Sequence, residues 1–295
     1  MSQDRPNGTG ISLDDSYTRC IEVTRERAQN FHFAFQVLPK EPYRAICALY
    51  AFARMADDYS DDEKDPNAAL AKAREWRDVF DRAVAGDTSG HAIMPAVADT
   101  VKRCRIPTEY FHELVAGTEM DASIQRYQTW DDAYKYCYCV ASVIGLMTIH
   151  VFGFEGAEAI PLAEKTGIAF QLTNILRDIK EDSERQRIYL PLEDLARHNV
   201  SEEDLLAGRD SAAFRDLVRF EVERAQGYYQ AGDELLPLIH AECRPALAAL
   251  VSIYGRLLDE IARRDYDVLS KRVSLSAGEK LRLAGRLVAQ TWLKR

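Results

Sequence analysis

Apolar side chains recur every three or four positions along most of the chain, and no convincing stretch alternates between apolar and polar residues. The first pattern places apolar residues on one face of an α-helix, whereas the second would have indicated a β-strand. Prolines fall at expected boundaries: Pro39 and Pro42 separate the first two helices, and Pro66 and Pro107 begin later ones. We predict an all-α protein with helices at roughly 13–36, 41–63, 66–85, 91–105, 107–126, 130–153, 156–184, 211–239, 242–270 and 276–293.

Three of these helices are apolar around most of their circumference, over 46–56, 140–154 and 168–176. A helix of that kind lies at the centre of a bundle or lines an apolar cavity. No break in composition, low-complexity linker or internal repeat divides the sequence. We therefore predict a single-domain helical bundle over 13–295 with a central apolar cavity, after a disordered N-terminal tail at 1–12.

The segment 185–210 interrupts the helical pattern without being low in complexity. Ser201, followed three residues later by Asp204, resembles a capping box that begins a short helix. Arg185, Arg187 and Tyr189 come directly after an acidic helix end. We interpret this connector as a lid or substrate-binding loop.

The formal net charge is −9 and the isoelectric point is near 5.3. A general nucleic-acid binder needs a basic footprint, so the sequence excludes that class. An acidic protein can still bind a phosphorylated substrate, because Mg²⁺ held by carboxylates carries positive charge to the phosphate.

The 6 cysteines show no paired spacing typical of a zinc site. No signal peptide is visible at the N-terminus, so we expect reduced thiols and a cytoplasmic location. The longest uncharged apolar run, Val140 to Phe154, is about 15 residues, whereas a membrane span needs roughly 18 or more. We interpret this run as a buried core helix.

A first acidic motif follows the apolar run at 46–56. Asp57 and Asp61 are four residues apart, so on a helix both carboxylates project from one face, with Asp58 beside them. Like charges at this spacing repel, and a hard divalent cation with oxygen ligands would remove the repulsion. A solvated helix end would look the same, because polar residues continue beyond Asp61.

A second motif has a longer polar stripe. Its members are spaced at +3, +4 and +4, which places them along one side of a single helix: Gln171, Asn174, Asp178 and Asp182. Such a stripe on an otherwise apolar helix needs polar partners or a wet cavity. The alternative is an internal hydrogen-bond network. Arg54, Arg177 and Arg187 lie near the two motifs, and guanidinium groups suit phosphate oxygens.

At these residues the sequence resembles the squalene/phytoene synthase family of trans-isoprenyl diphosphate synthases. The resemblance covers about 17–288 and follows the family's order of segments. These are Phe31-His-Phe-Ala-Phe with Leu38-Pro39, Ala48 to Asp58, Tyr136 to Gly145, Gln171 to Asp178, Arg187-Ile-Tyr-Leu-Pro191, and Tyr254 with Tyr266 and Arg272. One departure is Gln29-Asn30, where family members often carry a pair of serines.

The resemblance implies an isoprenoid-synthase-type bundle and a set of site residues. The implied Mg²⁺ ligands are Asp57, Asp61, Asn174, Asp178 and Asp182. The implied substrate-binding residues are Phe31, Arg54, Gln171, Asn174, Arg177, Arg187, Tyr189, Tyr254 and Arg272. Tyr50 is implied as a further catalytic residue beside the aspartates, and Tyr136 matches the tyrosine tied most closely to catalysis.

The expected reaction is the head-to-head condensation of two farnesyl diphosphates to presqualene diphosphate, and on to squalene if NADPH supplies the reduction. This C15 choice rests on resemblance alone: the segment 140–150 and the compact length of the chain are most similar to those of bacterial presqualene diphosphate and squalene synthases of the hopanoid pathway. The alternative is a phytoene synthase that condenses two geranylgeranyl diphosphates. The remaining alternative functions are a class I terpene cyclase and a catalytically inactive relative of the family.

We expect Mg²⁺ as the cofactor, with Mn²⁺ as a substitute, and leave NADPH use open. Expected partners are prenyl diphosphates, with loose association at the inner membrane face through apolar substrate and product, and no nucleic acid. Monomer and homodimer both stay open. Apolar walls at Phe31, Phe35, Val143, Leu146 and Leu172 should exclude water. Phe35, Val143, Leu146 and Met147 should close the far end of the cavity.

Overall fold

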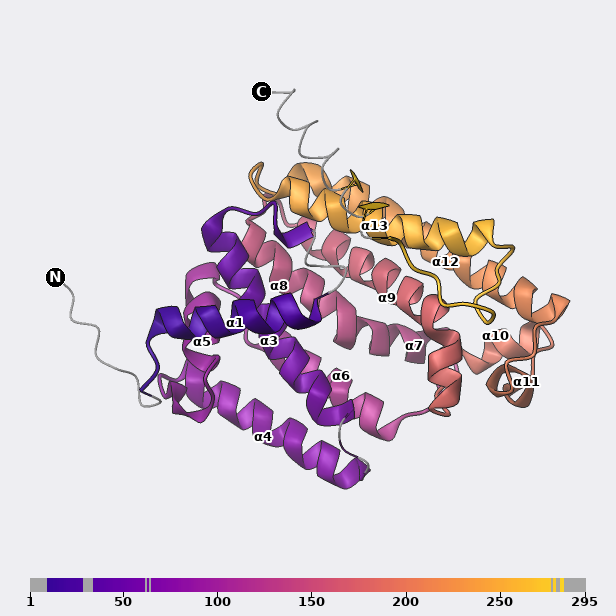
Figure 1. Ribbon diagram of the computed structural model, residues 1–295, viewed down its shortest axis with the longest axis horizontal. Coiled ribbons are helices and arrows are strands. Elements are labelled where there is room, and N and C mark those ends of the chain that lie inside the picture. Colours follow the sequence, from indigo (N-terminus) through magenta and orange to yellow (C-terminus); the bar gives the residue numbers. More distant parts are fainter. Residues whose placement is uncertain are drawn as a thin grey trace.

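The computed structural model describes residues 10–28, 34–61, 63, 65–276, 278–279 and 282–283, with the backbone alone at 59–61. Within these ranges the chain forms helices and two isolated bridges, and no strand (Figure 1). The prediction of an all-α, single-domain protein is confirmed. Most of the predicted tail, residues 29–33 and most of the predicted helix 276–293 lie outside the described residues.

The helices differ from the predicted ranges mainly at their ends. The first ends at Arg27, and two short helices form inside the connector. The helices are α1 (Leu13–Arg27), α3 (Lys40–Asp61), α4 (Pro66–Val84), α5 (Met94–Cys104), α6 (Glu109–Ser123), α7 (Trp130–Cys137), α8 (Val143–Phe152), α9 (Ala159–Glu184), α10 (Leu192–Arg197), α11 (Glu202–Leu206), α12 (Ala212–Leu235) and α13 (Arg244–Arg263).

Helix-capping residues explain where several of these helices begin. Pro66 occupies the first turn of α4, and the side chain of Asp65 caps it by accepting from the N–H of Asn67 at 3.1 Å. Thr129 forms a reciprocal capping box at the start of α7. Ser201 accepts from the N–H of Asp204 at 3.0 Å, so the predicted cap of the connector helix α11 is confirmed.

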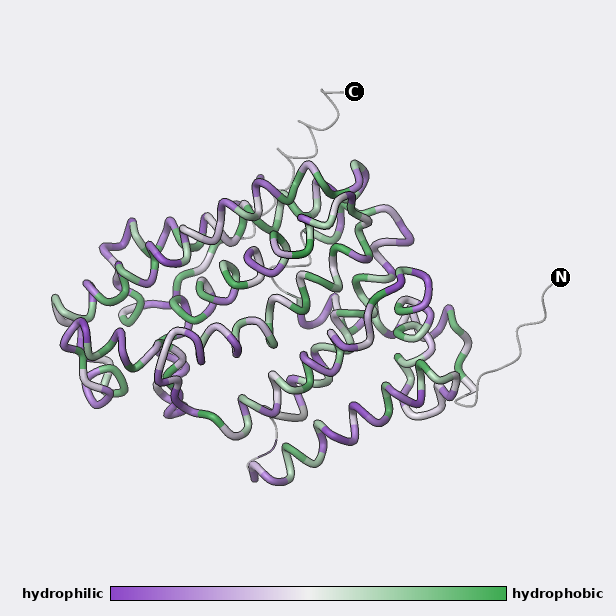
Figure 2. The backbone as a smooth tube through the Cα atoms, turned by 180° about the vertical axis from the view of Figure 1, so that it is seen from behind, coloured by the Kyte–Doolittle hydropathy of each residue, from purple (hydrophilic) through white to green (hydrophobic). Residues whose placement is uncertain are grey.

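Helix α9 runs through the middle of the bundle and packs against α7, α8, α12 and α13, while α3 packs against α1, α4, α5, α6 and α8 (Figure 1). Nearly every helix carries both apolar and polar positions (Figure 2). The buried side chains form two clusters, one around α3 that includes Phe52, Phe80 and Phe111, and one around α9 that includes Leu172 and Phe214. Burying each such side chain contributes roughly 1.5–3 kcal/mol to folding.

A five-residue π-helical turn, Tyr138–Ser142, joins α7 to α8. Two glycines make room for it. A Cβ on Gly117 would lie 2.8 Å from Val140 Cγ1, and a Cβ on Gly167 would lie 2.5 Å from Ser142 Cα. The turn adds one residue to the helical repeat, so it rotates every later side chain by about 100° relative to an uninterrupted α-helix.

Because of this rotation, part of the predicted cavity wall is wrong. Val143, Leu146 and Met147 are buried in the core and do not line the cavity, and Leu172 belongs to the core around α9. The cavity is lined instead by Ile144, Gly145, Thr148 and Ile149, while Phe35 lines it as predicted. A constant 3.6-residue period carried forward from Tyr136 selects the wrong face, because the period is broken at the π-turn.

The connector docks firmly on α12. Asp194 is fully buried and pairs with Arg224 at 2.8 Å, and Glu221 pairs with the same guanidinium at 2.9 Å. Arg224 also lies 4.4 Å from the centre of the Trp130 ring. Burial raises the pKa of Glu221 to about 8, against the opposing effect of Arg224, and the charge of Asp194 adds to the rise.

Within the described part of the chain, one helical stretch, Trp130–Phe152, has the length of 23 residues and the apolar composition that a membrane span would need. It is longer than the predicted apolar run because α7, the π-turn and α8 are continuous. More than half of its most apolar window, 56%, is buried inside the protein. This burial is typical of a core helix.

Candidate functional site

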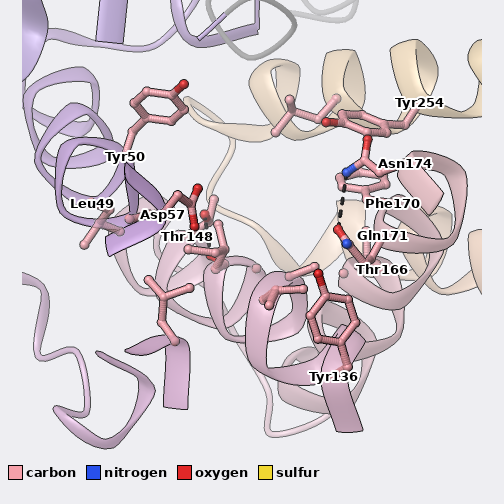
Figure 3. Close-up of a pocket in the computed structure, with 18 of the residues that line it drawn as sticks. Leu49, Tyr50, Asp57, Tyr136, Thr148, Thr166, Phe170, Gln171, Asn174 and Tyr254 are labelled. Carbon is pink, nitrogen blue, oxygen red and sulfur yellow. Dashed lines mark hydrogen bonds between the residues drawn. The ribbon is translucent and has the colours of Figure 1, made fainter. Parts of the chain in front are cut away.

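A cavity of about 470 Å³ lies between α3, α6, α8, α9 and α13. Its apolar half is lined by Phe35, Ile46, Leu49, Leu114, Ile144, Thr148, Ile149, Ala163, Thr166, Leu247 and Leu250. Its polar half is lined by Asp57, Asp121, Gln171, Asn174, Arg177, Asp178, Asp182, Arg185 and Arg187, with Tyr50, Tyr136, Tyr189 and Tyr254. In Figure 3, Tyr50 and Asp57 on α3 face Gln171 and Asn174 on α9 across the cavity.

The structure brings the whole predicted stripe of α9 to the cavity, since Gln171, Asn174, Asp178 and Asp182 all line it. Asn174 Nδ2 donates to Gln171 Oε1 at 3.3 Å (Figure 3). The buried Oδ1 of Asn174 has no hydrogen-bond partner among the described residues. A closed internal hydrogen-bond network therefore does not account for the stripe, because an acceptor is left open toward the cavity.

The two aspartates of this stripe have different surroundings. Asp178 accepts from Arg177 Nε at 2.8 Å and from Arg272 Nε at 2.8 Å, so two guanidinium groups share its carboxylate. Asp182 lacks such a direct pair among the described residues, and its pKa is raised to about 7 by burial and then by the charge of Asp178. Excess negative charge at this position is what a bound cation would relieve.

The neighbouring aspartates of the α3 motif point to different surroundings. Asp57 lines the cavity, whereas Asp58 pairs with Arg54 one turn earlier and lies 3.7 Å from Arg27 of α1. Arg54 is not on the cavity wall, and its buried Nε has no hydrogen-bond partner among the described residues. Asp61 belongs to the last turn of α3, and its side chain lies outside the described residues.

Several predicted aromatic residues form the walls between the two halves. Tyr254 stacks on Phe170 with ring centroids 4.5 Å apart, and Tyr136 stacks on Tyr189 at 5.0 Å. Burial raises the pKa of Tyr50 to about 12. These rings present π-faces beside the acidic region. Phe31, Gln29 and Asn30 lie outside the described residues, so their predicted roles are not placed.

Two residues of the site have no counterpart in the sequence-based prediction. Asp121 lines the cavity near the end of α6, and Tyr127, in the loop that follows, stacks on the tyrosines of the wall. Asp121 has no acidic partner at a spacing of three or four, which was the signal that identified the other aspartates. Nothing in its local pattern separates it from a surface residue.

An all-α bundle around one cavity, acidic and basic at one end and apolar at the other, has the architecture of an isoprenoid synthase. The profile of the squalene/phytoene synthase family matches residues 24–279. The chain belongs to this family, whose members are prenyltransferase-type enzymes that condense prenyl diphosphates head to head.

Individual relatives agree with this assignment. The chain is 35% identical to a phytoene synthase of Arthrospira platensis, covering 92% of each protein. It is 32% identical to a 15-cis-phytoene synthase of Synechococcus elongatus, covering 94% of each. Among solved structures, a dehydrosqualene synthase matches with a TM-score of 0.86, 29% identity and coverage of 96% of this chain and 98% of the other. The squalene synthase HpnC from Alicyclobacillus acidocaldarius matches with a TM-score of 0.80, 27% identity and coverage of 86% and 95%.

Proposed function

We propose that the protein condenses two geranylgeranyl diphosphates to phytoene and releases two diphosphates. The observation that carries the reaction class is one continuous cavity that joins the carboxylates of α3 and α9 to an apolar interior. The two sequence relatives described above favour the C20 donor, because both are phytoene synthases and both are more similar in sequence to this chain than the two squalene-type structures are. This proposal replaces the expectation of a farnesyl donor.

The argument from compact length loses its force in this comparison. The Arthrospira phytoene synthase and this chain each cover 92% of the other, so a chain of this size serves a phytoene synthase as well. The remaining support for a farnesyl donor is the likeness to the two squalene-type synthase structures and the segment 140–150. Its cavity-facing members include Ala141 and Gly145, which take up little space. Small side chains at the wall suit a longer prenyl chain.

The acidic end fits Mg²⁺. No three Asp, Glu, His or Cys side chains within the described ranges converge to hold a metal ion by themselves. Asp57, Asp178 and Asp182, with the open Oδ1 of Asn174, would hold Mg²⁺ together with diphosphate oxygens, and the predicted ligand Asp61 would add to them. Bound Mg²⁺ would stabilise the charge on the departing diphosphate as a Lewis acid.

The chain's own residues provide the rest of the mechanism. Arg177, Arg185 and Arg187 line the polar end, where their guanidinium groups bind and orient diphosphate oxygens. The apolar half excludes water from the allylic carbocation. Each exposed aromatic face stabilises that cation by roughly 0.5–2 kcal/mol. Formation of phytoene ends with loss of protons rather than gain of hydride, so the proposed reaction needs no NADPH.

A direct competition tests the proposal. The protein is incubated with Mg²⁺ and equal concentrations of farnesyl and geranylgeranyl diphosphate, with and without NADPH, and the products are identified by mass spectrometry. We expect phytoene as the main product and no effect of NADPH. Presqualene diphosphate or squalene as the main product would show that the donor is farnesyl diphosphate. A cyclic terpene made from one diphosphate would indicate a class I cyclase.

A further inference from the structure

A single carboxylate outside both aspartate motifs contacts two tyrosines of the cavity wall. Tyr136 of α7 donates from its hydroxyl to Asp121 Oδ2 at 3.2 Å. Tyr189, in the connector after α9, donates to Asp121 Oδ1 at 2.8 Å. All three residues line the cavity, so the carboxylate joins α6, α7 and the connector at one point of its wall.

The rings of these tyrosines pack against one another. Tyr136 and Tyr189 stack at 5.0 Å with an interplanar angle of 20°. Tyr127 packs against both, with ring centroids at 5.2 Å from Tyr136 and 6.2 Å from Tyr189. Because stacked rings cannot rotate independently, the hydroxyl orientation is the main freedom that Tyr136 and Tyr189 retain.

The protonation state of the phenols determines what they show to the cavity. Burial, and then the negative charge of Asp121, raises the pKa of Tyr136 well above 10, and the same two causes raise the pKa of Tyr189. Both phenols therefore stay neutral at physiological pH. A neutral phenol has one hydrogen to donate, and here both hydrogens point to Asp121. The oxygen of Tyr136 then keeps its lone pairs for the cavity, and the oxygen of Tyr189, which accepts from Arg187 Nη1 at 3.4 Å, keeps one.

We propose that Asp121 is a positioning residue for the condensation: it accepts both phenol hydrogens and thereby turns the oxygen lone pairs of Tyr136 and Tyr189 toward the carbocation. An O–H hydrogen turned toward the cation would instead repel it. The inference rests on the proposed function only in requiring a prenyl carbocation in this cavity. It is independent of whether the donor has 15 or 20 carbons.

Asp121→Asn is the informative substitution. The amide has one acceptor oxygen, and its nitrogen donates, so only one of the two phenols can keep its hydrogen bond. The other hydroxyl must turn away from residue 121. We expect kcat to fall by about 10- to 100-fold, the order seen when a preorganised electrostatic contact is removed. KM should change by less than about threefold, because none of the proposed diphosphate-binding side chains is itself replaced.

Two double variants separate positioning from a general structural role. If Asp121 acts through Tyr136, adding Asp121→Asn to Tyr136→Phe should cost less than about threefold more in kcat. Removing the phenol that competes for the amide oxygen should limit the further loss: Asp121→Asn with Tyr189→Phe should lose less than about threefold more in kcat than Asp121→Asn alone. In that variant the amide oxygen is available to Tyr136.

Glu113→Gln provides a matched control on the same helix. Glu113 Oε2 accepts from the hydroxyl of Tyr138 at 2.9 Å, so the same kind of hydrogen bond is weakened at residues that do not line the cavity. Its kcat should stay within about twofold of the wild-type value. Melting temperatures measured for all variants show whether stability explains any loss.

The assay measures initial rates with whichever prenyl diphosphate the wild-type protein consumes, over a series of Mg²⁺ concentrations. Near-wild-type kcat for Asp121→Asn would overturn the inference, as would a loss fully additive with Tyr136→Phe. A loss that saturating Mg²⁺ restores would make Asp121 a metal ligand and would also overturn it. If Asp121→Asn does not fold, Asp121→Glu replaces it, and its loss should vanish in the Tyr136→Phe background. A wild-type protein that consumes neither diphosphate would contradict the proposed function instead.

Discussion

Arg272 donates from Nε to Oδ1 of Asp178 at 2.8 Å and so ties the segment after α13 to the acidic stripe of α9. Asp178 is also held by Arg177, and Arg272 lies 3.3 Å from Glu181. The proposed metal ligand thus already has cationic partners in the protein. These guanidinium groups lie where a diphosphate held at Asp178 would contact them.

Replacing Arg272 should affect catalysis more than stability. Its side chain is 48% exposed, so Arg272→Gln should change the free energy of unfolding by no more than about 1 kcal/mol. The lost diphosphate contact should raise KM several-fold. Steady-state kinetics and urea unfolding measure the two effects. Arg263→Gln, which removes the pair between the exposed Arg263 and the buried Glu260, is the control and should leave KM unchanged.

The metal site gives a second prediction. Asp57→Asn and Asp178→Asn should each lower kcat by at least about 100-fold, because each removes a proposed ligand of the ion that stabilises the leaving group. Chelation of divalent ions should abolish wild-type activity, and added Mg²⁺ should restore it. Glu184→Gln, at the exposed end of α9, should behave as wild type. Near-normal turnover of either aspartate variant would exclude the two-helix site.

The buried pair of carboxylates at Arg224 predicts a pH-dependent stability. The pKa of Glu221 is raised by burial from 4.5 to about 8, so the folded state keeps a proton that the unfolded state releases. The associated stability is fully present below about pH 4.5 and is lost as the pH rises through about 8. Glu221→Gln should flatten this part of the profile in urea unfolding, whereas the exposed Glu223→Gln should not. A wild-type profile that is flat from pH 5 to 9 would contradict the assignment.

Thr148 gives a prediction about donor length. Its hydroxyl donates to the carbonyl of Ile144 at 2.7 Å, so the side chain offers its methyl group at the apolar half of the cavity. Thr148→Phe should fill this space and lower kcat/KM for geranylgeranyl diphosphate at least tenfold more than for farnesyl diphosphate, about 1.4 kcal/mol of discrimination. Met147→Leu, a volume-conserving change in the core, should leave the ratio unchanged. Equal losses for both donors would show that Thr148 does not limit chain length.

Regular repetition determined how much of the fold and site could be predicted from the sequence. The stripe from Gln171 to Asp182 was predicted because every member obeys the spacing of a straight helix, and all of it reaches the cavity. Val143, Leu146 and Met147 were predicted to line the cavity because they are apolar and lie on a central helix, and that criterion does not determine which face of α8 borders the cavity. The π-turn that sets this face leaves no mark in a periodicity pattern. The role of Asp121 depends on its contacts with Tyr136 of α7 and Tyr189 of the connector, and local spacing does not encode contacts between different elements.

Helix α9 borders both ends of the cavity. Ala163 and Thr166 lie beside the apolar half, and Asp178 and Asp182 lie at the acidic end. At about 1.5 Å of rise per residue, the distance from Ala163 to Asp182 along the axis is roughly 28 Å and is set by backbone geometry. Descendants of this chain therefore cannot change donor length by sliding one end of the site relative to the other. Along this helix, a change of donor length must therefore come from exchanging side chains that line the apolar half, at a fixed distance from the acidic residues.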